Sequence, residues 1–139
     1  METTYNIHPV GWIHKKEGGI TIEIEPRYAD ALLGMETFSH ILVLYWFHEN
    51  DDAENRRILQ VRPRKNPKNP LTGVFATHAP VRPNLIAVST CKIESITGTT
   101  IRIDDIDARD GTPVVDIKCY LPEKKAVEDL KLPDWITQD

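Results

Sequence analysis

The residues best suited to chemistry surround an Asp-Gly pair in the segment 107–113, DARDGTP. An Asp-Gly pair before a β-favouring run predicts a tight turn, which exposes several backbone N–H groups at one point. A turn of this kind can hold a polar ligand. The same residues also fit an ordinary hairpin without a ligand, and the spacing alone leaves both interpretations open.

Three polar side chains follow this turn on a predicted strand. Strand alternation places Val114, Asp116, Lys118 and Tyr120 on one face, with Asp116 and Lys118 as near neighbours. In a cleft, a carboxylate, an ammonium and a phenol can bind a ligand and shift one another's pKa values. An ion pair on an open surface would do neither and would contribute little. We predict Asp116, Lys118 and Tyr120 as catalytic candidates, with the surface pair as the alternative.

A second constellation is the loop 79–84, APVRPN, in which two prolines flank an arginine. Proline restricts the backbone, so Arg82 and Asn84 would be offered at fixed geometry, as a preorganised binding site requires. The alternative is a plain connection between strands.

A basic stretch precedes that loop. Residues 56–68 contain six cations and no acid, although the whole chain carries a net charge of −4. Because aromatic residues 45–47 lie nearby in the sequence, the stretch is a candidate surface for RNA phosphates beside stacking rings. A solvated strand edge with buried aromatics is the alternative. The cations are Arg56, Arg57, Arg62, Arg64, Lys65 and Lys68.

The five histidines show neither HxxxH nor HxH spacing, which argues against a metal centre built from sequence neighbours. His48 ends an apolar run beside Glu49, where a side chain can emerge into a cleft, or serve as a structural, hydrogen-bonded histidine. No GxSxG motif and no GxGxxG motif is present. We therefore expect any nucleotide cofactor to bind a fold other than the Rossmann fold.

The elements that would position these residues are mostly strands. Ile20 to Glu25 alternates strictly, whereas Ile41 to Phe47 is continuously apolar, as in a strand covered on both faces. In Leu85 to Cys91, small side chains on one face suit the interior of a closed barrel. One short helix is predicted from Arg27 to Leu33, between Pro26 and Gly34. Further strands are predicted at 7–13, 57–62, 74–77, 100–106 and 114–120.

The expected fold is therefore an all-β, single antiparallel β-barrel with short helices. With 139 residues the chain suits one domain, which we place at residues 1–122, followed by a charged C-terminal tail at 123–139. No apolar run is long enough to span a bilayer, and we expect a cytoplasmic protein without membrane association. Cys91 and Cys119 lack a CxxC pattern and are interpreted as buried small hydrophobes.

Two segments together resemble a known family. Residues 73–89, GVFATHAPVRPNLIAVS, and 107–122, DARDGTPVVDIKCYLP, are similar to the paired signatures of the TsaA-like, or TrmO, family. Phe47-His48 and the opening segment 9–13, PVGWI, also match, so that the resemblance covers about residues 7–122.

The resemblance implies a non-Rossmann barrel, S-adenosylmethionine as cofactor, and commonly a homodimer. Characterised members methylate N6-threonylcarbamoyladenosine at tRNA position 37, which implies a tRNA partner rather than DNA. The family's cofactor contacts fall on His48, Glu49, His78, Val88, Ala108, Arg109, Asp110 and Gly111. The basic stretch and the RPN core then supply candidate tRNA contacts at Arg62, Arg64, Lys65, Arg82 and Asn84.

This sequence departs from the family pattern at one cofactor position in particular. His78 replaces an arginine, so a permanent bidentate donor gives way to a group that is mostly neutral at pH 7. The loop 14–19 is also shorter than in many members. Two other hypotheses therefore stay open: a non-catalytic module that binds S-adenosylmethionine or RNA, and a methyltransferase that acts on a small molecule.

Overall fold

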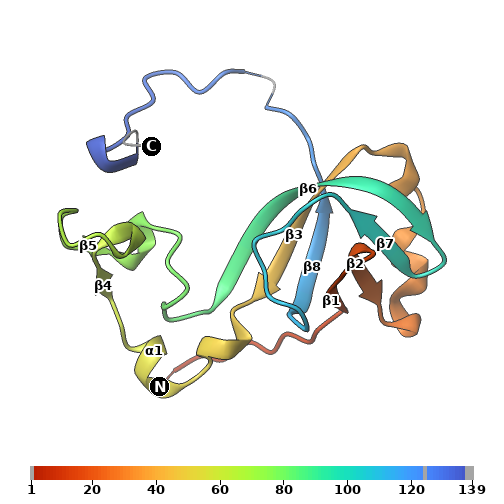
Figure 1. Ribbon diagram of the computed structural model, residues 1–139, viewed down its shortest axis with the longest axis horizontal. Helices are drawn as coiled ribbons and strands as arrows, with labels where there is room; N and C mark the ends of the chain where they lie inside the picture. Colours follow the sequence, from red (N-terminus) through yellow and green to blue (C-terminus); the bar gives the residue numbers. More distant parts are fainter. Residues whose placement is uncertain (1, 124, 137–139) are drawn as a thin grey trace.

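The computed structural model describes residues 2–123 and 125–136 and contains a closed barrel of six antiparallel strands (Figure 1). Around the barrel the strand order is β1-β2-β7-β6-β3-β8. These strands are β1 (Gly11–Lys16), β2 (Gly19–Ile24), β3 (His40–Trp46), β6 (Ile86–Thr97), β7 (Thr100–Ile103) and β8 (Pro113–Cys119). The predicted all-β, non-Rossmann barrel is confirmed.

Alternation along the strands fills the barrel interior with branched aliphatic side chains. On β2, Ile22 and Ile24 are buried, and on β3 the buried positions are Ile41, Val43 and Tyr45. The predicted inward face of β6 is also confirmed, since every second residue from Leu85 to Cys91 is buried or half-buried. Small residues there let the opposite strands approach closely.

A lobe, residues 47–84, interrupts the barrel between β3 and β6 and stands beside it (Figure 1). It consists of the 3-10 helix η3 (His48–Asn50), α1 (Ala53–Arg56), β4 (Gln60–Val61), η4 (Pro63–Lys65), β5 (Thr72–Gly73) and η5 (Val74–Ala76). The strands β4 and β5 pair only with each other. The lobe buries few residues, and Pro63, Asn69 and Val74 are among them.

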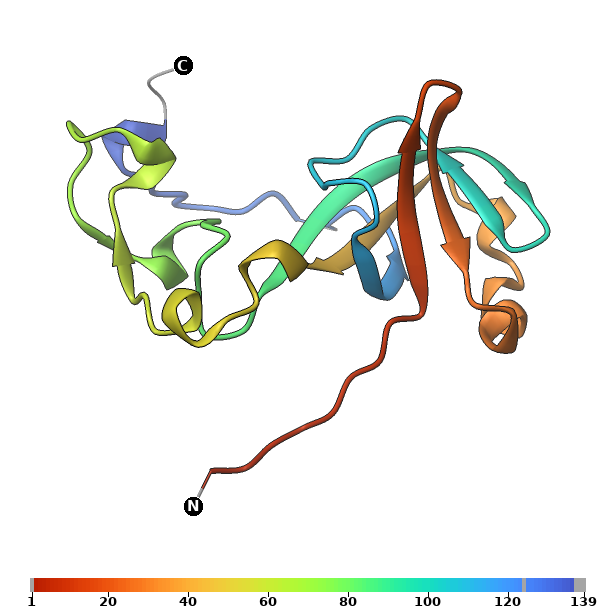
Figure 2. The ribbon, with the colours of Figure 1, turned by 60° about the horizontal axis from the view of Figure 1, so that its bottom comes forward.

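Both ends of the chain leave the barrel as extended segments. Residues before β1 run outward as an exposed arm, and the tail after β8 crosses to the lobe (Figure 2). There it forms η6 (Asp134–Ile136), where the Arg64 guanidinium donates a hydrogen bond to the Ile136 carbonyl at 3.3 Å. The predicted C-terminal tail, 123–139, also includes residues 124 and 137–139, which lie outside the described residues.

Several predicted element types are wrong. The segment 74–77 forms the 3-10 helix η5 instead of a strand, and 57–62 pairs only at β4, because proline-rich loops flank both segments. The first strand begins at Gly11 instead of Ile7. Val10 still donates to the Val114 carbonyl and accepts from the Glu25 N–H, but residues 7–9 make no backbone hydrogen bond to another described segment. The predicted helix after Pro26 is the 3-10 helix η1 (Pro26–Leu32), followed by η2 (Met35–Thr37).

The prediction that Val114 shares a face with Asp116 is also wrong. Opposite β8, Leu44 pairs with Asp116 and Tyr45 with Val114, so Val115 is an extra residue in a β-bulge. The bulge reverses the alternation: Val114 and Ile117 face the core, and Asp116 faces outward. Strand β3 was predicted to be covered on both faces, but its buried residues all lie on one face.

The two cysteines differ in environment. Cys91 is fully buried in the barrel, as predicted, whereas Cys119 is exposed because it is the last residue of β8. Within residues 2–123 and 125–136, no helix is long and apolar enough to cross a membrane.

Candidate functional site

The principal pocket lies where the barrel meets the lobe and has a volume of about 780 Å³, within the range of small-molecule sites. Its walls come from the end of β3, the start of β6, the loop after β7 and the lobe. The lining residues are Tyr45, Trp46, Phe47, His48, Glu49, Asn50, Lys65, His78, Pro80, Arg82, Ile86, Ala87, Val88, Ser89, Asp107, Ala108, Arg109 and Thr112.

Tyr45, near the end of β3, joins this strand to β6 and to the loop 107–112 at the pocket. Its hydroxyl donates to the Asp107 carbonyl at 3.0 Å and lies 2.9 Å from the Ser89 hydroxyl. Burial raises the pKa of Tyr45, while the Ser89 hydrogen bond lowers it less, so the phenol stays protonated and donates. From the sequence, Tyr45 is expected only to be an aromatic ring in an apolar run. The need of a buried hydroxyl for a partner was the available signal.

The loop 107–112 is a turn between β7 and β8, which are not paired with each other, so it is no hairpin. The Thr112 N–H donates to the Arg109 carbonyl at 3.2 Å, and Gly111 has a φ of 82°, which favours glycine. The Asp110 carboxylate accepts from the Lys15 N–H at 2.8 Å. In the described part of the chain, no hydrogen bond uses the backbone N–H of Ala108 or Arg109. Both residues line the pocket and can donate to a ligand.

An ion pair joins this loop to the lobe at the exposed edge of the pocket. Arg109 and Glu49 lie 2.7 Å apart, with 78% and 54% of their side chains exposed. Such an exposed pair contributes about 1 kcal/mol or less to stability.

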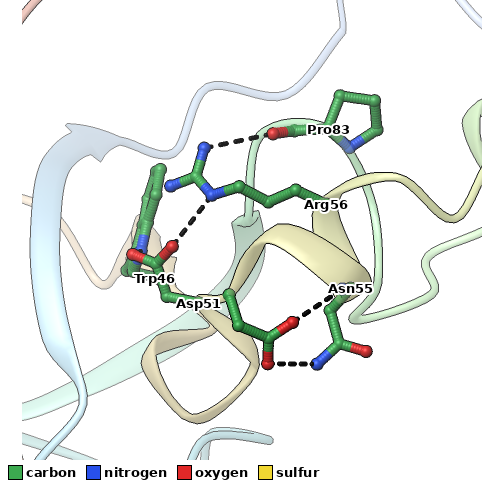
Figure 3. Close-up of polar contacts among 6 residues, drawn as sticks. Trp46, Asp51, Asn55, Arg56 and Pro83 are labelled. Atoms are coloured by element: carbon green, nitrogen blue, oxygen red, sulfur yellow. Dashed lines mark hydrogen bonds and ion pairs between the residues drawn. The ribbon is translucent and has the colours of Figure 1, made fainter.

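Arg56 contacts three residues beside the pocket (Figure 3), and one of them, Trp46, belongs to the pocket lining. Its Nε lies 2.8 Å from the Asp51 carboxylate, its Nη1 donates to the Pro83 carbonyl at 3.2 Å, and its guanidinium covers the Trp46 ring. The Trp46 indole donates to the same Asp51 carboxylate at 3.0 Å. We refer to Trp46, Asp51, Arg56 and Pro83 as the Arg56 clamp. These contacts lower the pKa of Asp51, with the Arg56 hydrogen bond as the largest cause.

Three further hydrogen bonds hold the proline-rich loop beside the clamp. The Asn50 amide donates to the Pro80 carbonyl at 3.2 Å, and Arg82 donates to the Thr77 and Ala79 carbonyls at 3.2 and 3.1 Å. The Asp52 side chain caps α1 by accepting from the Asn55 N–H at 2.7 Å. The loop 79–84 is thus preorganised by hydrogen bonds as well as by its prolines.

The basic loop at η4 is backbone-strained. Arg64 and Lys65 have φ values of 58° and 54°, in the left-handed region, which costs side-chain-bearing residues about 1–2 kcal/mol each. Asn69, only 5% exposed, holds the loop: its amide donates to the Pro63 carbonyl at 2.9 Å. Its own carbonyl accepts from Arg62 at 2.8 Å.

The structure brings together eight of the predicted site residues and leaves the others outside the pocket lining. Those inside are His48, Glu49, Lys65, His78, Arg82, Val88, Ala108 and Arg109. Five others do not line the pocket. Asp110 and Gly111 belong to the loop 107–112 and fix its backbone, and Arg62, Arg64 and Asn84 lie in the lobe. Asp116 and Lys118 form an exposed ion pair at 3.7 Å, and neither they nor Tyr120 line the pocket. The bulge in β8 accounts for their outward direction.

Among residues 2–123 and 125–136, no cluster of His, Cys, Asp and Glu side chains has the arrangement of a metal site. The charged groups in the pocket lining are the carboxylates of Glu49 and Asp107 and the cations of Lys65, Arg82 and Arg109.

Comparison with known proteins gives consistent results. Residues 7–126 match the tRNA-methyltransferase O N-terminal domain family. A probable S-adenosyl-L-methionine-binding protein of Pyrococcus horikoshii is 50% identical over 86% of this chain and 85% of its own length. A mouse tRNA (adenine(37)-N6)-methyltransferase is 37% identical over 73% of this chain but only 23% of its own length.

A solved structure has the same fold. The crystal structure of TrmO from Pseudomonas aeruginosa aligns with 97% of this chain, with a TM-score of 0.71 and 30% sequence identity. This chain spans 63% of the length of that structure.

Proposed function

Since this chain belongs to the tRNA-methyltransferase O N-terminal domain family, we propose that it is an S-adenosylmethionine-dependent methyltransferase that acts on tRNA. The acceptor we propose is N6 of threonylcarbamoyladenosine at position 37, in keeping with the name of the mouse relative. The observation that carries the proposal is the convergence of eight expected contact residues on one pocket of about 780 Å³.

The residues of the pocket suit this cofactor chemically. The N–H groups of Ala108 and Arg109 and the Glu49 carboxylate match the carboxylate, hydroxyl and ammonium groups of a nucleoside amino acid. Val88, Ile86 and Trp46 offer apolar surface for an adenine ring. When bound, the cofactor supplies an activated methyl group on sulfonium sulfur. We propose that His48, Glu49, His78, Val88 and residues 108–111 hold it, directly or through the turn geometry.

The work left to the protein is mainly positioning. A rigid wall that aligns the acceptor nitrogen with a donor methyl group lowers the entropic part of the barrier. The Arg56 clamp and the Tyr45 hydrogen bonds supply rigid walls of this kind. Of the candidate bases that could remove the proton, His48 lines the pocket. The Asp110 carboxylate does not line it and accepts a hydrogen bond from the Lys15 N–H. Asp116, Lys118 and Tyr120 keep the catalytic role we predicted only if a second subunit brings them to a pocket.

Assembly as a homodimer is part of the proposal. Apolar side chains are exposed along the N-terminal arm and the tail, where Tyr5, Val127 and Leu130 are 87%, 59% and 67% exposed. Surfaces of this kind mark sites of association. Light scattering should give twice the chain mass, and a monomeric mass at all protein concentrations would reject the dimer.

The decisive test is transfer of labelled methyl groups to tRNA. Purified protein incubated with labelled S-adenosylmethionine and total tRNA should label an adenosine at position 37, and tRNA lacking the threonylcarbamoyl group should stay unlabelled. A folded protein that labels no tRNA would reject the enzymatic function.

A second candidate is a module that binds the cofactor without catalysis. It is favoured by His78 in place of the family's arginine and by relatives named only as S-adenosyl-L-methionine-binding proteins. Methyl transfer separates the two functions, because calorimetry should show several-fold stronger cofactor binding by His78→Arg in both cases. Only the enzyme should show methyl transfer by the wild type.

A further inference from the structure

Lys65 differs from the other basic residues of its loop. Arg62 donates to the Asn69 carbonyl and Arg64 to the Ile136 carbonyl, so both guanidinium groups hold the fold together. The Lys65 ammonium, in contrast, makes no hydrogen bond or ion pair to any described residue and lines the pocket. The loop therefore presents one unpaired cation to the site.

The backbone conformation of η4 determines where the Lys65 side chain lies. Two successive residues with side chains, Arg64 and Lys65, occupy the left-handed region, and the buried Asn69 amide holds the loop in that shape. A glycine or asparagine would adopt the same backbone with less strain. Strain at a ligand-facing position is a common feature of functional sites.

The other cations of the pocket are already engaged. Arg109 pairs with Glu49, and Arg82 donates to two carbonyls of its own loop. An unpaired ammonium in a partly enclosed pocket attracts an anionic oxygen through charge-assisted hydrogen bonds. Lys65 is thus the lining cation best placed to accept a new anionic partner.

We propose that Lys65 recognises an anionic oxygen of the acceptor, either the carboxylate on the modified base or a backbone phosphate next to it. This inference rests on the proposed function, because it takes the acceptor to be an RNA. Lys65 enters the pocket from η4, whereas Val88 comes from β6, residues 108–111 come from the loop before β8, and the remaining expected cofactor contacts, His48, Glu49 and His78, come from other parts of the lobe. It is therefore a specificity residue for the acceptor.

The test compares two anticodon stem-loop RNAs, identical except that one carries the threonylcarbamoyl group on adenosine 37. Their affinities for the wild type, Lys65→Gln and Lys68→Gln are measured by fluorescence anisotropy. Lys68 is the matched control, because it lies in the same basic stretch but does not line the pocket. Cofactor affinity is measured for each variant by calorimetry.

We expect Lys65→Gln to weaken RNA binding about tenfold, as loss of one charge-assisted contact does, and Lys68→Gln to weaken it less than about twofold. A loss confined to the modified RNA identifies the carboxylate as the partner. An equal loss with both RNAs identifies a phosphate. Equal effects of the two variants, or no RNA binding by the wild type, overturn the inference. It is also overturned if Lys65→Gln weakens cofactor binding as much as RNA binding.

A second variant separates recognition from folding. Lys65→Asn removes the ammonium but tolerates the left-handed backbone, so its melting temperature should be no lower than that of the wild type. The same loss of RNA affinity is expected. A lower melting temperature together with unchanged RNA affinity would mean that Lys65 has a structural role only.

The two proposals fail separately. Binding that depends on Lys65 without any methyl transfer would reject the proposed function and leave this inference standing. Methyl transfer by the wild type that is equally efficient in Lys65→Gln would reject this inference alone.

Discussion

At the scale of single residues, the hydrogen-bonding capacity of buried polar atoms accounts for much of the site. The Tyr45 hydroxyl and the Asp110 carboxylate contact backbone far away in the sequence, and both contacts fix the loop 107–112. Leaving a buried polar group without a partner costs more than the bond itself contributes. Tyr45, which is buried and lies outside both signature segments, therefore positions the expected ligand contacts, together with the exposed Asp110 of the second segment.

Tyr45→Phe should loosen this loop. The substitution removes the hydroxyl that joins Ser89 to the Asp107 carbonyl, at an expected cost of about 1–2 kcal/mol in unfolding free energy. Cofactor affinity, measured by calorimetry, should fall several-fold while the barrel stays folded. Tyr28→Phe is the control, because no hydrogen bond of the Tyr28 hydroxyl occurs among the described residues. Equal affinities in wild type and Tyr45→Phe would contradict the positioning role.

The two thiols should differ sharply in reactivity. Burial raises the pKa of Cys91 to about 11, with the Asp104 and Asp105 charges as lesser causes, whereas Cys119 is exposed. A thiol reagent should modify Cys119 in the native protein and both cysteines in denaturant. Because the thiolate is the reactive form, the raised pKa of Cys91 should keep this thiol unmodified in the native protein when the pH is raised from about 7 to about 9. Rapid native modification of Cys91 would show that the barrel opens.

At the scale of elements, the short lobe helices depend on side-chain tethers more than on their own propensity. The helix α1 has one turn, too short to be stable alone, and its capping by Asp52 and the Arg56 clamp hold it against the pocket. Because the clamp joins the end of β3, the residue after η3, α1 and the loop 79–84, this part of the pocket wall should respond as a unit when one member is changed.

Asp51→Asn should weaken this wall in a pH-dependent way. The lowered pKa of Asp51 means that its carboxylate stabilises the fold above its ordinary value of 3.8, and that this stabilisation is lost as the pH falls through the lowered pKa. Solvent screening limits the effect to about 1 kcal/mol, because 42% of the side chain is exposed. Denaturant unfolding should show a difference from wild type at pH 7 that disappears in acid.

Glu54→Gln provides the matched control for Asp51→Asn. It removes the same charge three residues further along the chain, in α1, but the Glu54 side chain makes no hydrogen bond or ion pair with the clamp. Its unfolding free energy should stay within about 0.5 kcal/mol of the wild type. A similar loss in both variants would mean that net charge, rather than the clamp, sets the stability of the wall.

At the scale of the whole molecule, the closed barrel carries the stability and the lobe carries much of the site. The barrel holds a continuous aliphatic core, whereas the tail crosses to the lobe with most of its side chains exposed. The division into a barrel domain at 1–122 and a tail at 123–139 remains a prediction. It is consistent with a fold that does not need the tail for its core.

Truncation after Pro122 tests that division. The barrel should keep its cooperative unfolding, with a melting temperature lowered by less than about 4 °C, because the tail contributes few buried contacts. Differential scanning calorimetry measures the change. A fall of more than about 10 °C would show that the tail belongs to the folding unit. Loss of the Arg64 contact to Ile136 should act mainly on the lobe.

The sequence by itself determined the barrel, the inward face of β6, the turn at Asp110-Gly111 and the family, because local patterning and turn chemistry are written in neighbouring residues. Only the tertiary structure decided which polar residues meet. The bulge at Val115 turned Asp116 outward, and the lobe brought Lys65 to the pocket. Bulges and loop placement depend on contacts between segments far apart in the chain, which alternation along one strand does not encode.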